Sequence, residues 1–334
     1  MKKRIIVMFF TSLIGFYFMM AAEIFPYREN GKYGLMDQDF EIIEFAEYDS
    51  MNPECENRYF IAGKTKNNNR EFFVFNSKGI CVYKSDQNIS HIWNDCFSLS
   101  TKTGEKLISL NSDKEIIAFQ FVSSQEPIIP CRKDVYRQYI DPTGNIIFPE
   151  LEFRRAYGFY ENHSINLNKD WQYEVIDING EYKFGKDFIE LGQHFSEGLL
   201  YARDKKGNSG YVNYDGKFKI LIPLKTTDED TCIGTDFYKG RAIVNTVNHG
   251  ICLISKDGEL IKDNIKVSWF YNFCDDYALV KRKDGYFNFL SLEGTFLFDE
   301  DFDDAKDFCN GYAIIKLKGT DGLINKNGEI KILR

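Results

Sequence analysis

The chain has 334 residues, of which 43% are hydrophobic and 16% aromatic, so it can bury a substantial core as two ordinary domains or one large β domain. The aromatic content favours β structure, because pleated, half-buried surfaces suit Phe and Tyr. A net charge of −8 disfavours binding to nucleic acid or to anionic lipid, because an acidic surface repels phosphate groups.

Residues 1–22 have the layout of a secretory signal. The stretch "MKKR" (1–4) is basic, and residues 5–22 carry no charge. Ala21-Ala22 before Glu23 offers a cleavage site, although Met20 fits the A-x-A pattern poorly. The apolar run is also just long enough for a tilted membrane span. The alternatives are a cleaved signal, an uncleaved anchor and a buried structural segment, and the first two predict an exported protein.

The rest of the chain, residues 23–334, is predicted to be a single domain built from an internal repeat. A turn glycine recurs with a period close to 36 residues, apart from one short gap of 25, at Gly79, Gly104, Gly144, Gly180, Gly216, Gly258, Gly294 and Gly328. An earlier copy, "KYGLMDQDF" (32–40), has Phe40 where the glycine would stand. Fixed periods of this length indicate a repeat architecture.

Each copy predicts a short strand, a tight turn and a return strand. Strands are expected at 33–37, 72–76, 138–142, 173–177, 210–214 and 322–326, with return strands such as 145–149 and 217–224. Asn-Gly and Asp-Gly turns supply the positive φ that tight hairpins need. A linking segment then ends in Phe and leads into a third strand, at Phe159, Phe195, Phe237, Phe273 and Phe308. These Phe residues keep step with the glycines, so each unit is expected to hold three strands.

The motifs "GKYGLMD" (31–37), "FSEGLLYARDKKGNSGYVNYDGK" (195–217) and "FCNGYAIIKLKGTDGLINKNGE" (308–329) resemble the bacterial WG (KWG) repeat. The resemblance covers nearly all of residues 24–334 and is weakest between 51 and 135. The Trp of the family's name is absent here, as in Tyr33-Gly34. The resemblance implies an all-β fold of about eight repeats, with a possible ninth.

Two architectures suit such units, because a single unit cannot bury its own apolar face. The first is a β-propeller, in which sheets pack radially. The second is an open β-solenoid or superhelical array. The chain begins in mid-unit, and this offset favours a propeller whose N-terminal strand completes the final blade. The stretch 81–130 is irregular and is interpreted as an eroded or shortened unit.

Residues with chemical potential give no catalytic, cofactor-binding or metal-binding pattern. The cysteines form no C-x-x-C, and their expected role is that of small buried apolar residues, with one or two disulfides as the alternative. They are Cys55, Cys81, Cys96, Cys131, Cys232, Cys252, Cys274 and Cys309. The histidines form no close pair and are expected on the surface or on edge strands; they are His91, His163, His194 and His249.

The densest acidic cluster, "DEDFDDAKD" (299–307), fails the EF-hand pattern, because Asp304 stands where Gly is required and Asn310 where Glu is required. A solvated turn is expected there. The aromatic residues, including Trp93, Trp171 and Trp269, are expected in the core, with an exposed binding groove as the alternative.

The sequence therefore predicts an exported, non-catalytic WG-repeat scaffold without cofactors, which binds a protein or an extracellular polymer through loops between units. If it has a site, the loop residues Asp275, Asp276, Asp303 and Asp304 are the candidates. The alternative is an envelope hydrolase acting on glycans, which needs two carboxylates roughly 5 to 10 Å apart in a pocket.

Overall fold

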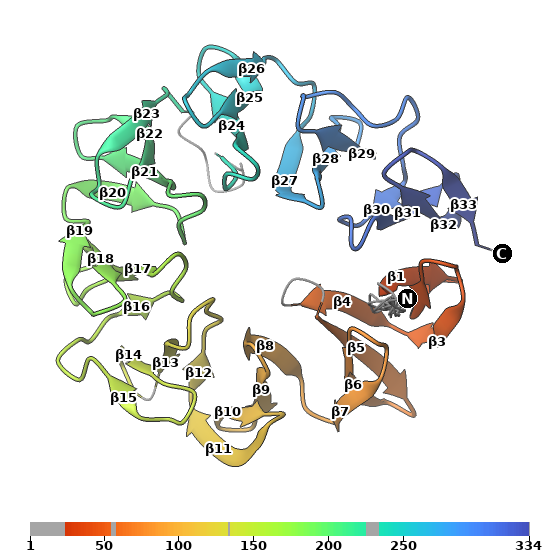
Figure 1. Cartoon of the computed structure of the whole chain (residues 1–334), viewed down its shortest axis with the longest axis horizontal. Helices are drawn as coiled ribbons and strands as arrows, with labels where there is room; N and C mark the ends of the chain where they lie inside the picture. The colour runs from red at the N-terminus through yellow and green to blue at the C-terminus, as the bar shows by residue number, and fades with distance from the viewer. Residues whose placement is uncertain (1–23, 55–57, 133, 225–233, 334) are drawn as a thin grey trace, which may run out of the picture.

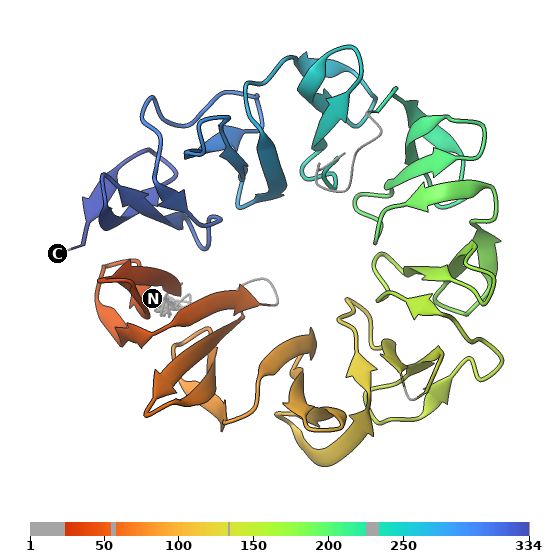
Figure 2. The ribbon, with the colours of Figure 1, turned by 180° about the vertical axis from the view of Figure 1, so that it is seen from behind.

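A computed structural model describes residues 24–54, 58–132, 134–224 and 234–333. Within these ranges the chain forms strands and no helix, and the strands form nine sheets arranged as the blades of a propeller (Figures 1 and 2). The expected all-β propeller is therefore confirmed. Residues 1–23, including the predicted signal or anchor, lie outside the described part.

The blades follow one another along the chain, and we number them 1 to 9. Blade 1 has β1 (Ile24–Glu29), β2 (Lys32–Asp37) and β3 (Ile42–Tyr48); blade 2 has β4 (Ser50–Glu54), β5 (Tyr59–Lys66), β6 (Asn69–Asn76) and β7 (Cys81–Ser85). Blade 3 has β8 (Ile89–Trp93), β9 (Cys96–Thr101), β10 (Gly104–Ser109) and β11 (Ser112–Ala118); blade 4 has β12 (Gln120–Phe121), β13 (Ile129–Arg132), β14 (Arg137–Ile140) and β15 (Ile146–Ile147).

Blade 5 has β16 (Arg155–Ala156), β17 (His163–Leu167), β18 (Tyr173–Asp177) and β19 (Tyr182–Phe184); blade 6 has β20 (Phe188–Leu191), β21 (Leu200–Asp204), β22 (Ser209–Val212) and β23 (Phe218–Leu221). Blade 7 has β24 (Arg241–Thr246), β25 (Gly250–Ser255) and β26 (Leu260–Lys262); blade 8 has β27 (Trp269–Cys274), β28 (Tyr277–Lys281) and β29 (Phe287–Ser291). Blade 9 has β30 (Asp304–Ala305), β31 (Tyr312–Leu317), β32 (Thr320–Asn325) and β33 (Ile330–Ile332).

Most blades contain four strands rather than the three expected from the repeat. The linking segment before each landmark Phe supplies an additional strand, which lies nearest the ring centre, as β8 and β30 do in Figure 1, while β11 and β33 lie on the rim. The sequence pattern concealed this inner strand because it is short and lacks a glycine turn of its own.

The expected exchange of a strand between the chain ends is wrong. β1 pairs with β2 inside blade 1, and β30 to β33 form a complete sheet from consecutive strands. The ring instead closes through side chains, since the rings of Phe25 and Tyr312 stack at 4.2 Å between blades 1 and 9. The unit boundary falls before the inner strand, so each described blade is contiguous in sequence.

A side-chain oxygen caps the turn between the last two strands of each blade. It accepts main-chain hydrogen bonds from the residue two positions on and, in most copies, four positions on, which stabilises the turn locally. The nine capping residues are Asp37, Asn76, Ser109, Asp141, Asp177, Asn213, Ser255, Ser291 and Asn325. They span 288 residues in eight steps, an average of 36.

The irregular stretch 81–130 is not an eroded unit. It holds the four strands of blade 3 and the beginning of blade 4. Gly104 lies in the hairpin between β9 and β10, whereas the repeat's turn lies between β10 and β11, where Asn111 N–H donates to Ser109 Oγ. The short gap of 25 therefore arose from comparing two different hairpins.

The core lies between blades. Each cluster of buried apolar side chains joins neighbouring blades, as where Phe184 of blade 5 packs with Phe195 and Val212 of blade 6. This confirms that the units shield one another's apolar faces. The turn glycines sit directly against an outer side chain of the preceding blade, and Gly216 against Phe184 is one example.

Phe40 replaces the turn glycine at the one junction where blade 9 meets blade 1. It adopts a φ of 64° and makes edge contacts with Phe25 and Tyr312, at ring centroid distances of 6.3 and 5.4 Å. The Lys331 ammonium lies over its ring. Phe40 thus fills the junction that a glycine would leave open.

Candidate functional site

The junction of blades 9, 1 and 2 differs from the rest of the ring because β1 forms the inner edge of its sheet. In every complete blade the strand equivalent to β1 is covered on that side by an inner strand. Blade 7 has isolated bridges in this position, Leu224 with Thr246 and Gly234 with Val244. Among the described residues, blade 1 alone has nothing paired there.

A cavity of about 260 Å³, which we call the inner cavity, occupies this position. It lies beside β1, between the inner strand β4 of blade 2 and residues 306–309, which continue the inner strand of blade 9. Its walls are mainly apolar and include Pro26, Met51, Pro53, Tyr312 and Ile314. An apolar pocket with few polar groups is the usual form of a binding site.

Three polar side chains line the inner cavity, namely Asn52, Lys306 and Asp307. Asp307 is exposed as a whole residue, but neighbouring atoms crowd its carboxyl, and this desolvation raises its pKa above the ordinary value despite the nearby Lys306. The cavity therefore combines apolar walls with hydrogen-bonding groups.

A second, polar cavity of about 630 Å³ lies farther along β1, and we call it the clasp cavity. The Arg28 guanidinium, 8% exposed, crosses the junction here: Nη1 binds Asp304 Oδ2 at 2.7 Å and Nε binds Asp321 Oδ1 at 2.9 Å. Burial alone would lower the pKa of Arg28, but Asp304, Tyr33 and Asp321 outweigh it and raise the pKa. This clasp ties blade 1 to blade 9.

The other carboxylates of the clasp cavity also hold the local backbone. Asp303 Oδ2 accepts from Gly319 N–H at 2.7 Å. Asp49 pairs with Lys32 and accepts from Thr65 N–H, and these contacts hold its pKa at about 2. With Lys316, the cavity has four carboxylates and two cations in its lining, so it favours a positively charged ligand.

The structure does not bring the four predicted loop residues together. Asp303 and Asp304 begin the inner strand of blade 9, in the clasp cavity. Asp275 and Asp276 lie in the turn after β27, near the far end of that inner strand, because Asp275 Oδ2 accepts from Gly311 N–H at 2.6 Å.

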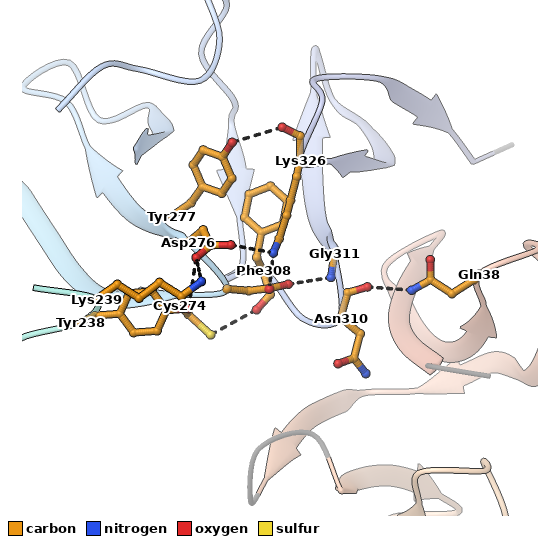
Figure 3. A network of polar contacts seen from close by, with 11 residues as sticks. Gln38, Tyr238, Lys239, Cys274, Asp276, Tyr277, Phe308, Asn310, Gly311 and Lys326 are labelled. Atoms are coloured by element: carbon orange, nitrogen blue, oxygen red, sulfur yellow. Dashed lines mark hydrogen bonds and ion pairs between the residues drawn. The ribbon is translucent and has the colours of Figure 1, made fainter. Parts of the chain in front are cut away.

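Asp275 and Asp276 belong to a polar network that links the turns of successive blades (Figure 3). Asp276 pairs with Lys239 of blade 7 and, at 3.1 Å, with Lys326 of blade 9. Asn310 accepts from Gln38 at 2.8 Å across the ring closure. Earlier in the ring, Glu161 accepts from Glu197 N–H at 2.6 Å. These contacts explain the acidic turns as links between blades.

His194 makes a polar contact between blades that sequence reasoning missed. Its Nε2 lies 2.9 Å from Asp236 Oδ2, and Asp236 in turn accepts from Asn272 Nδ2 at 2.8 Å. All three residues precede a landmark Phe, so their common repeat position was the available signal. No nucleophile appears in the hydrogen bonds of this group.

Six cysteines lie in the described residues, and all six are free: Cys81, Cys96, Cys131, Cys252, Cys274 and Cys309. Cys274 and Cys309 lie on neighbouring blades, as their spacing predicted. Cys55 and Cys232 lie outside the described residues. Of the Trp residues, Trp171 is 61% exposed, with the Arg154 guanidinium over its ring, whereas Trp93 and Trp269 are partly buried.

The described ranges contain no group of three His, Cys, Asp or Glu residues arranged to hold a metal ion. They also contain no helix of the length and hydropathy needed to cross a membrane.

No family model and no curated protein matches this sequence. The structure is similar to the crystal structure of a eukaryotic initiation factor, with a TM-score of 0.61 and 9% identity over 93% of this chain and 96% of that one. It also matches the crystal structure of BamB from Moraxella catarrhalis, with a TM-score of 0.46 and 10% identity over 85% and 95% of the two chains. At such low identity, the likeness to the initiation factor shows the fold alone.

Proposed function

We propose that this propeller is an exported, non-catalytic scaffold built from divergent WG-type repeats, and that it binds a protein at the junction of blades 9, 1 and 2. The inner cavity carries this proposal, because it is an apolar recess beside an unpaired strand edge. The signal-like layout of residues 1–22 supports export.

The arrangement of carboxylates supports binding over hydrolysis. Asp304 and Asp321 are the pair that comes closest to a two-carboxylate site, but both bind the Arg28 guanidinium. A glycan hydrolase needs one carboxyl that holds a proton and one that is free to act on the sugar. Two carboxylates committed to one buried cation provide neither, so a clasp between blades is the better role for them.

Site-specific photocrosslinking in the producing cell tests the proposal. A benzophenone side chain replaces Asn52, which is exposed and lines the inner cavity, and Ser90 serves as the matched control position. Both residues lie on inner strands, opposite the third residue of the next strand, because Asn52 faces Ile61 and Ser90 faces Ser98. We expect an adduct of discrete mass from position 52 and none from position 90. Equal labelling from both positions would contradict a binding site at the junction.

Export has a separate readout. Intact mass of the protein from the envelope or medium should show loss of residues 1–22, or their retention in a membrane-tethered form. Recovery of the unprocessed chain from the cytosol would contradict export.

A further inference from the structure

We propose that the unpaired inner edge of β1 binds an extended segment of a partner protein, which adds to blade 1 as its fourth strand. This inference rests on the proposed function and states how the partner binds. The segment carries an apolar side chain for the inner cavity and a basic side chain for the clasp cavity.

Blade 9 shows which main-chain groups of β1 face the vacant position. In β31, Lys316 C=O accepts from Asp303 N–H at 2.8 Å, and Ile314 C=O accepts from Lys306 N–H at 2.9 Å. The register of β1 matches that of β31, because Ile24 faces Asp37 as Tyr312 faces Asn325. Ile24, Pro26 and Arg28 therefore direct their main-chain groups toward the ring centre.

Several of these groups are available to a partner. Ile24 C=O already accepts from Asn310 Nδ2 at 2.7 Å. In the described part of the chain, no strand pairs with the remaining groups, which are Pro26 C=O and both main-chain groups of Arg28. Proline is suited to such an edge because it has no N–H to leave unpaired. Exposed strand edges of this kind bind extended peptides by β-augmentation.

The two cavities lie one after the other along this edge. Pro26 lines the inner cavity, and Arg28 and Gly31 line the clasp cavity. Residues two positions apart in a strand are about 7 Å apart and point to the same side. An extended segment therefore reaches both cavities with alternate side chains, one among apolar walls and one among carboxylates.

The direction of the segment follows from the other blades. Each described inner strand runs antiparallel to the strand that it covers, as β30 does to β31. A segment in the same direction places its N-terminal part beside Arg28 and its later part beside Pro26. The partner motif is then a basic residue followed two positions later by an apolar residue.

Fluorescence anisotropy with the full chain and a labelled peptide of sequence Thr-Lys-Thr-Leu-Thr-Val-Thr tests this mode. N-methylation of the Lys or the Leu nitrogen removes a main-chain hydrogen bond to β1, and we expect affinity to fall at least about tenfold. N-methylation of the Thr between them, whose N–H points away from β1, should change affinity less than about twofold. Replacing the Lys by Glu should weaken binding about tenfold, because the carboxylates of the clasp cavity then repel the peptide.

Matched protein variants locate the binding site. Asn52→Trp fills the inner cavity and should abolish peptide binding, whereas Ser90→Trp on the neighbouring inner strand should leave it unchanged. Asp303→Asn keeps an oxygen acceptor for Gly319 N–H but removes the charge, so it should weaken binding of the Lys peptide and not of a Lys-to-Thr peptide.

Three results would overturn strand addition: no binding of the peptide at millimolar concentration, equal effects of all N-methylations, or crosslinks from position 52 to residues 5–22 of the chain or to a second copy. The last two crosslinks would identify the chain itself as the occupant. If position 52 instead crosslinks a partner protein while the N-methyl series stays flat, the binding scaffold stands and the mode of binding is wrong.

Discussion

Single residues in this repeat meet two demands at once, as the turn glycines show. Gly216 has a φ of 72°, and a side chain added to it would meet the Phe184 ring of the preceding blade at 2.5 Å. Gly240 has nearly the same φ, 73°, and a side chain there would meet nothing within 4 Å. The two positions therefore separate backbone strain from packing between blades.

We expect Gly216→Ala to destabilise the protein more than Gly240→Ala. Both variants force alanine into a positive φ, at a cost of about 1 kcal/mol. Gly216→Ala also overpacks the junction with Phe184, which adds about 1 to 3 kcal/mol. Urea unfolding followed by circular dichroism measures both values. Equal destabilisation would show that packing of the turn against the neighbouring blade contributes nothing.

At the scale of the element, the three outer strands were predictable and the inner strand was not. The expected strands at 72–76, 173–177 and 322–326 fall within β6, β18 and β32. They could be read because each ends in an Asn or Asp that caps its turn. Inner strands such as β16 and β30 contain only two residues each, too few for an alternating pattern to appear.

The turn caps also explain why the irregular blade misled a search based on glycine. Blade 3 keeps its cap, Ser109, but has no glycine two positions beyond Leu110, where Ser112 begins β11. The capping side chain marks all nine described blades, whereas the glycine does not. A residue that accepts hydrogen bonds within its own turn is a local requirement and therefore persists when the contact with the next blade changes.

The carboxylate caps predict an acid-dependent stability. Burial alone would raise the pKa of Asp141, but hydrogen bonds donated by Thr143 and Asn145 outweigh it and hold the pKa at about 2, below the ordinary 3.8. Because the folded-state pKa is depressed, the carboxylate stabilises the fold above about pH 4, and this contribution is lost as the pH falls toward 2.

Asp141→Asn should therefore flatten the decline in thermal unfolding temperature between pH 4 and pH 2, because the amide retains the acceptor oxygen without titrating. Asn213→Asp makes the reverse change at the equivalent position of blade 6 and should steepen the decline. Thermal melts across this pH range measure both slopes. Parallel curves for all three proteins would contradict a role for the Asp141 charge.

For the whole molecule, the ring closure is the feature that local patterns could not predict. The 36-residue period correctly indicated a stack of mutually shielding units, and the position of Phe40 in the first turn was visible in the sequence. That Phe40 packs on Tyr312, and that Arg28 pairs with Asp304 and Asp321, depends on where the ring brings its ends together. Nothing within one repeat encodes this meeting, and neither the inner nor the clasp cavity could be located without it.

Because the described sheets share no strand across the closure, we expect the junction of blades 9 and 1 to open more readily in Arg28→Met than in the parent protein. Removing one partner of a buried ion pair leaves Asp304 and Asp321 uncompensated and costs about 3 to 5 kcal/mol. Hydrogen exchange followed by mass spectrometry should show faster exchange in β1, β31 and β32, with β20 to β22 on a distant part of the ring unchanged, because local openings follow local stability. Arg203→Met is the matched control, since Arg203 pairs with Glu190 inside blade 6 at 3.6 Å and holds no two blades together. If Arg28→Met speeds exchange evenly around the ring, the propeller opens as one cooperative unit and the closure is not its weakest junction.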